Sequence, residues 1–86
     1  MSADLQISVR DGDTVSDAEL KLRALLSMLL LRNLHPAVVR PHPNRRAAAA
    51  EVRANLTIDP TPDRHRKVDV HSAVHRAGLE VRRLTS

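Results

Sequence analysis

The sequence predicts an α+β sandwich, because patterns typical of strands and of helices follow one another along its 86 residues. Apolar and polar residues alternate at positions 5–9 and 50–58, which is the period of a half-buried strand. Residues 17–32 and 62–77 instead repeat apolar side chains at helical spacing. Two shorter apolar segments complete the order strand, helix, strand, strand, helix, strand. With two helices to cover one face of an antiparallel sheet, this order predicts a ferredoxin-like fold.

The first strand and the first helix have well-marked ends in the sequence. The alternation of residues 5–9 stops at a turn-forming segment, residues 11–13. Ser16 then occupies the first position of a capping box, which predicts a helix over residues 17–32. Asn33 follows, and asparagine is one of the few residues that end a helix in the left-handed conformation.

This first helix is apolar on two opposite sides. The side expected to face the core carries Ala18, Leu22, Leu25, Leu26 and Leu29. The second strip consists of Leu20, Ala24, Met28 and Leu31. A chain of this size covers one such side with its own sheet but has hardly enough residues to cover both. We therefore expect the second strip to be an interface, either between copies of the chain or with a partner protein. The alternative is that a loop or the chain ends fold over it.

The middle of the chain permits two interpretations. Residues 37–40 form a short strand candidate, which the prolines of residues 41–44 are expected to cut off. Residues 45–58 contain four consecutive alanines, which favour a helix, but their second half alternates strictly and ends in residues that favour strands. We predict a strand that pairs with residues 37–40 as a hairpin. If residues 45–55 were helical instead, the protein would be a mainly helical small domain.

The second helix has a clearer end than start. Thr61 can cap a helix that begins at Pro62, and Asp69 can cap a shorter version. Gly78 is the natural left-handed stop. Residues 79–84 then form the last strand, and Arg83 interrupts its apolar alternation, which predicts a position at the edge of the sheet.

The composition excludes several functions. The chain contains no Phe, Tyr or Trp, so it offers no aromatic platform for stacking bases and no aromatic cage for a cation. It contains no cysteine, which excludes disulfides, thiol nucleophiles and cysteine-ligated zinc. No apolar segment is long enough to span a bilayer. We expect one soluble, cytoplasmic domain over residues 1–86, without a membrane partner.

Basic residues give the chain a second candidate function. The formal net charge is +4, and it is unevenly distributed, because the first twenty residues contain five acidic residues and one basic residue. Two basic clusters suit phosphate groups, one beside the proline-rich segment and one before the second helix; their residues are Arg40, Arg45 and Arg46, and Arg64, Arg66 and Lys67. Such clusters predict salt-dependent, sequence-tolerant binding of nucleic acid, or contact with an acidic protein. The alternative is that they are solvated loops.

Catalysis and metal binding receive little support from the sequence. His71 and His75 are four residues apart, a spacing that places two imidazoles on one face of a helix and can hold Zn²⁺ or Ni²⁺. Two ligands do not complete a site, and the glutamate of a helical zinc-protease motif is missing. We expect no metal, no cofactor and no catalytic residues. The sequence thus favours a non-enzymatic interaction or regulatory module that self-associates through its apolar helix strip or its sheet.

Overall fold

Six elements follow one another in the predicted order. The structure, a computed structural model of the chain, describes residues 1–9, 15–43 and 52–85. Its elements are β1 (Ala3–Val9), α1 (Val15–Leu30), β2 (His35–Pro43), β3 (Val52–Asp59), α2 (Arg64–Arg76) and β4 (Leu79–Thr85). The order β-α-β-β-α-β confirms the ferredoxin-like fold. The mainly helical alternative is wrong, because residues 52–59 form a strand.

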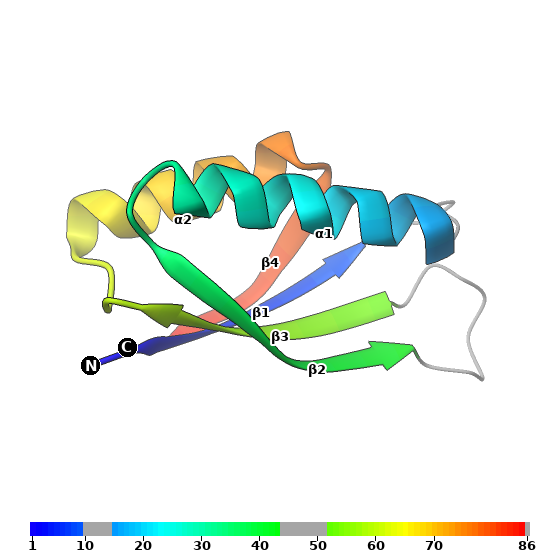
Figure 1. Ribbon diagram of the computed structural model, residues 1–86, viewed down its shortest axis with the longest axis horizontal. Helices are drawn as coiled ribbons and strands as arrows, with labels where there is room; N and C mark the ends of the chain where they lie inside the picture. The colour runs from blue at the N-terminus through cyan, green and yellow to red at the C-terminus, as the bar shows by residue number, and fades with distance from the viewer. Residues whose placement is uncertain (10–14, 44–51, 86) are drawn as a thin grey trace.

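The four strands form one antiparallel sheet in the order β2-β3-β1-β4. Both helices lie on the same side of this sheet and run in opposite directions, so the molecule has one helical layer and one open sheet face (Figure 1). Within the helical layer α1 packs against α2 and β2, whereas α2 packs against β4. The edge strands are therefore β2, beside α1, and β4, beside α2.

The core lies between the sheet and the helices, where the alternating residues of the central strands meet the buried faces of both helices. From the strands it contains Ala3, Leu5, Ile7, Val9, Ala54, Leu56, Ile58 and Leu79. From the helices and their ends it contains Ala18, Leu25, Leu29, Leu34, Val70, Ala73, Val74 and Ala77. Leu22 and Leu26 pack against this core from partly buried positions, as expected for the core-facing side of α1.

β2 is longer than the sequence predicted. It continues through Pro41 and Pro43, where a break was expected after Arg40. The reason is its position: β2 pairs only with β3, and a proline that lacks its N–H is tolerated in an edge strand. The register with β3 also shifts between Val38 and Arg40, a β-bulge that adds local twist.

β4 is the other edge strand, as the interrupted alternation predicted. Its pairing with β1 shifts register at a bulge, so that Val81 pairs with Ile7 while Arg83 pairs with Gln6. Arg82 is the extra residue between them. The bulge explains the interruption, because it restores the inward position of Leu84, which packs partly buried against the core.

The helix ends fit the sequence in part. Asn33 and Gly78 have the positive φ angles expected of left-handed stops, 57° and 80°. α1 begins at Val15, however, so Ser16 lies in the first turn and does not precede the helix. α2 is capped by Asp63, whose carboxylate accepts a hydrogen bond of 2.9 Å from the Arg66 amide. The caps predicted at Thr61 and Asp69 are therefore wrong, because β3 and the bend at residue 60 place Asp63 before the first turn.

Candidate interaction surface

The side of α1 that faces away from the sheet presents large apolar residues. Leu20 is 62% exposed and Leu31 is 84% exposed, and Ala24 between them is also exposed. Ser27 is exposed on the same side, at a helical spacing of three from Ala24 and four from Leu31. None of the described residues covers these positions. We call Leu20, Ala24, Ser27 and Leu31 the outer strip.

Met28, which the sequence placed in the second apolar strip, occupies a different position. Its side chain is partly buried and packs against the core. At 100° per residue it lies on the flank of α1 that also carries Lys21 and Arg32, which is the flank toward α2. Arg32 donates from its guanidinium to the Met28 carbonyl over 2.8 Å and so covers part of this flank. The exposed strip is consequently narrower than the sequence predicted.

Three exposed apolar residues were not singled out from the sequence as surface residues. Leu30 and Val68 are more than half exposed and Val38 is 43% exposed. Leu30 stands in a run of three leucines, which by itself does not indicate which one faces solvent. Val38 pairs with Leu56 and therefore belongs to the helix-covered face, but it lies on the edge strand, beyond the full cover of α1. Tertiary position decides the exposure of all three.

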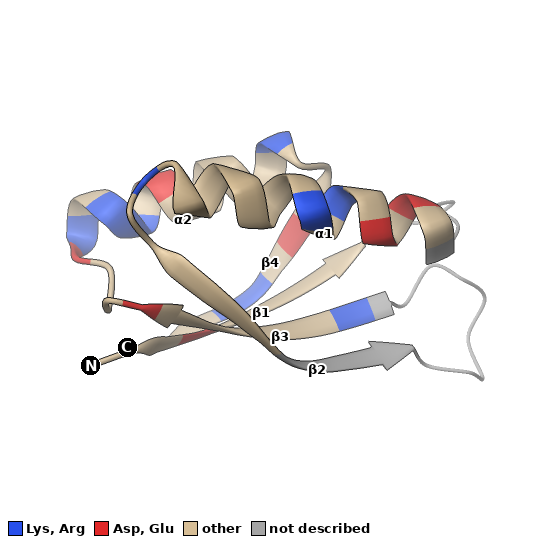
Figure 2. Cartoon of the chain, in the orientation of Figure 1, with Lys and Arg blue, Asp and Glu red and all other residues tan. Residues whose placement is uncertain are grey.

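The basic residues of α2 gather at one end of the molecule. Arg64, Arg66 and Lys67 lie in the first turns of α2, close to the end of α1, whereas the acidic start of α1 lies at the opposite end (Figure 2). Arg66 is partly buried, and its guanidinium donates to the Arg32 carbonyl over 3.0 Å. One member of the predicted phosphate-binding cluster thus joins two helices.

The other predicted phosphate-binding cluster has no described side chains. Arg45 and Arg46 lie outside the described residues, and Arg40 belongs to β2 without a described side chain. Pro43 and Val52, which border the intervening segment, lie at the end of the sheet opposite to the first turn of α2 (Figure 1).

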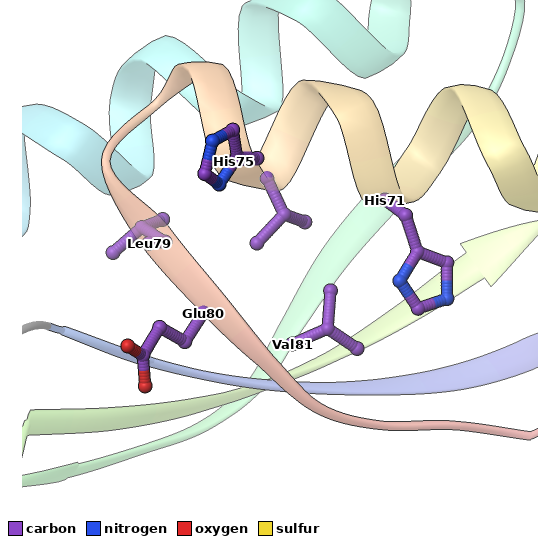
Figure 3. A pocket seen from close by; sticks show the side chains of 6 residues that line it. His71, His75, Leu79, Glu80 and Val81 are labelled. Carbon is purple, nitrogen blue, oxygen red and sulfur yellow. The ribbon is translucent and has the colours of Figure 1, made fainter.

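His71 and His75 line a hollow of about 510 Å³ between α2 and β4. Val74, Leu79 and Val81 form its apolar part, and Glu80 lies on the strand with its carboxylate directed away from the helix (Figure 3). In the part of the chain that the structure describes, no three His, Cys, Asp or Glu side chains are grouped so that they could share a metal ion. The two histidines thus belong to a groove without a third ligand.

The open face of the sheet is polar. Gln6 pairs with Asn55 on one side and Arg83 on the other, and Asp4 pairs with Thr57. A shallow hollow of about 210 Å³ lies between β1 and β3 at these residues. Mixed charges and amides of this kind suit contact with water or a polar partner, and they offer no apolar area for a stable interface.

Neither described helix has the length and apolar character needed to cross a bilayer. Comparison of the chain with protein-family models, with characterised proteins and with solved structures finds no match.

Proposed function

We propose that this protein is a non-catalytic cytoplasmic interaction module that forms a homodimer through the outer strip of α1. One observation carries the proposal: the order of large and small residues along the exposed strip is the same from either end of the helix. The residue types are Leu, Ala, Ser and Leu, large at both ends and small in the middle, with spacings of four, three and four. A two-fold axis requires such self-complementarity, because each contact between two residues occurs twice.

An antiparallel pair of α1 helices satisfies this symmetry. Leu20 of one copy packs against Leu31 of the second copy, and Ala24 packs against Ser27. Small residues at the centre allow the helix axes to approach to about 8–10 Å.

The apolar area of the strip supports a weak dimer. Full burial of an exposed leucine side chain stabilises by about 1.5–3 kcal/mol, and the interface buries two such side chains from each copy. The sum is of the same order as the loss of translational and rotational freedom on association, about 4–15 kcal/mol. We therefore expect a concentration-dependent dimer with a Kd in about the micromolar range or weaker.

The sheet is less suited to self-association than the helix strip. Its open face is polar, and the edge strand β2 contains Pro36, Pro41 and Pro43, which cannot donate to another strand. At the other edge, two copies of β4 paired about their middle would bring Arg82 of each copy together, and like charges in that position destabilise.

Absolute mass in solution tests the proposal, measured by size exclusion with light scattering and refractive-index detection. The protein is expected to move from monomer toward dimer as its concentration rises. The double variant Leu20→Glu with Leu31→Glu should remain folded and monomeric. Val68→Glu is the matched control, because Val68 is similarly exposed but lies on α2, and it should dimerise normally. A monomeric parent protein at millimolar concentration, or dimerisation of the double variant, would exclude the outer strip.

A further inference from the structure

We infer that the open edge of β4, with the groove between β4 and α2, binds an extended acidic segment of another protein as an added strand. β4 pairs with β1 on one side, and no other described strand pairs with it on the other. An edge strand presents unpaired backbone groups that can accept a further strand. This inference concerns a different surface from the outer strip and does not depend on the dimer.

The groove provides a place for the side chains of such a strand. It has a volume of about 510 Å³, and its apolar part consists of Val74 from the helix and Leu79 and Val81 from the strand. Side chains of an added strand alternate between the two faces of the sheet, so every second one would enter this hollow. His71 and His75 stand on the helical side of the hollow (Figure 3). Apolar side chains of moderate size, such as valine, suit this space.

The charges around the groove select an acidic partner. Arg64, Lys67 and His71 follow the spacing i, i+3, i+7, which places them on the flank of α2 that borders the groove. The bulge in β4 puts Arg82 and Arg83 next to each other in exposed positions on the strand. Arg83 pairs with Gln6 and so belongs to the open face of the sheet, opposite the groove. An added strand that places alternate apolar side chains in the groove turns its carboxylates to that open face, beside Arg83, while Arg64, Lys67 and His71 keep the helical rim of the groove basic.

The same features disfavour other occupants. A second copy of β4, paired about its middle, would place Arg82 of one copy opposite Arg82 of the other, and this like-charge pair would destabilise the complex. Nucleic acid has no peptide groups to extend the sheet, and the chain has no aromatic side chains on which bases could stack. Glu80, the acidic residue that lines the groove, points away from α2 and leaves the helical side basic (Figure 3).

The test uses a blocked hexapeptide of alternating valine and glutamate, titrated into isotopically labelled protein at low salt. Amide signals of residues 79–81 and of His71 should shift, and the edge amides of β4 should become protected from hydrogen exchange. A Kd of about 0.1–1 mM is expected for so short a segment. The double variant Arg82→Glu with Arg83→Glu should weaken binding by at least about tenfold. Arg23→Glu with Arg53→Glu reverses two exposed arginines elsewhere and should leave binding unchanged.

Two further probes separate strand addition from simple charge attraction. The same hexapeptide with N-methyl groups on alternate residues keeps its charge but cannot extend the sheet, and it should fail to protect the β4 amides. A single-stranded oligothymidylate should not shift residues 79–81. Absence of peptide binding, equal binding of the N-methylated peptide, or preferential binding of the oligonucleotide at these residues would each overturn the inference.

Discussion

The guanidinium of Arg66 donates a hydrogen bond of 3.0 Å to the main-chain carbonyl of Arg32, and so joins the first turn of α2 to the end of α1. Carbonyls at the end of a helix have no partner within the helix and carry the negative end of its dipole. Arg32 itself donates to the Met28 carbonyl over 2.8 Å. Backbone amides bond the Leu29 and Leu30 carbonyls, and the two arginines bond the Met28 and Arg32 carbonyls at and just after the end of α1.

Replacement of Arg66 should therefore destabilise the fold. Arg66→Met keeps most of the apolar stem but removes the donor, and we expect a loss of about 1–2 kcal/mol in the free energy of unfolding. Arg64→Met is the control, since Arg64 is exposed, and should change stability by less than about 0.5 kcal/mol. Denaturant unfolding followed by far-ultraviolet circular dichroism measures both. Equal effects of the two variants would contradict a structural role for Arg66.

The start of α2 provides a second prediction. Asp63→Ala removes the side-chain acceptor for the Arg66 amide and should cost about 1 kcal/mol of stability. Asp69→Ala lies in an exposed position within the helix and should be neutral or slightly stabilising, because alanine has the higher helix propensity. The same unfolding experiment compares the two. A larger loss from Asp69→Ala would mean that the helix starts later than Arg64.

Gly78 should resist substitution because of its backbone conformation. At a φ of 80° an added side chain is strained, and a Cβ would also approach the Lys21 Cε to 3.0 Å. The lysine end can move aside, so the backbone conformation is the main cost. We expect Gly78→Ala to lose about 1–2 kcal/mol of stability, and Gly78→Asn to lose clearly less because asparagine tolerates the left-handed region. Equal losses for both variants would contradict this cause.

The two sides of α1 can be compared directly. Leu25 is fully buried, and Leu25→Ala should cost about 2–5 kcal/mol through lost burial and the cavity left behind. Leu30 lies in the same helix but is 53% exposed, and Leu30→Ala should cost less than about 1 kcal/mol. Thermal unfolding by circular dichroism measures the pair. A larger effect at Leu30 would show that α1 faces the sheet with a different side.

The sequence predicted the elements whose patterns are local. The strict alternation of residues 52–58 outweighed the helix propensity of the alanines before it. Because α1 and α2 cover only one face of the sheet, every second residue of β3 from Ala54 to Ile58 is apolar and faces the helices. Asn33 and Gly78 were found because few residue types adopt a positive φ. In each case the signal is a property of a few neighbouring residues.

The features that the sequence did not predict depend on tertiary position. The prolines of β2 are tolerated because that strand lies at the edge, which the residues themselves do not indicate. Met28 was predicted to be exposed but is partly buried, because α2 lies on its flank of α1. The groove beside His71 and His75 exists because α2 packs over β4. Arg66 was predicted to bind phosphate. Its partner in the structure, the Arg32 carbonyl, lies 34 residues away in the chain, so no local pattern indicates this contact.

The most direct measurement of the central claim is site-specific disulfide formation across the outer strip. The chain has no cysteine, so Leu20→Cys and Leu31→Cys each introduce a single thiol. Positions 20 and 31 are about 16 Å apart along the helix, so only an antiparallel pair brings position 20 of one copy to position 31 of the other. When the two variants are mixed and oxidised, the mixed disulfide between residues 20 and 31 should dominate by mass spectrometry. A statistical mixture of the three disulfides, or dominance of the 20–20 and 31–31 species, would contradict the antiparallel α1 dimer.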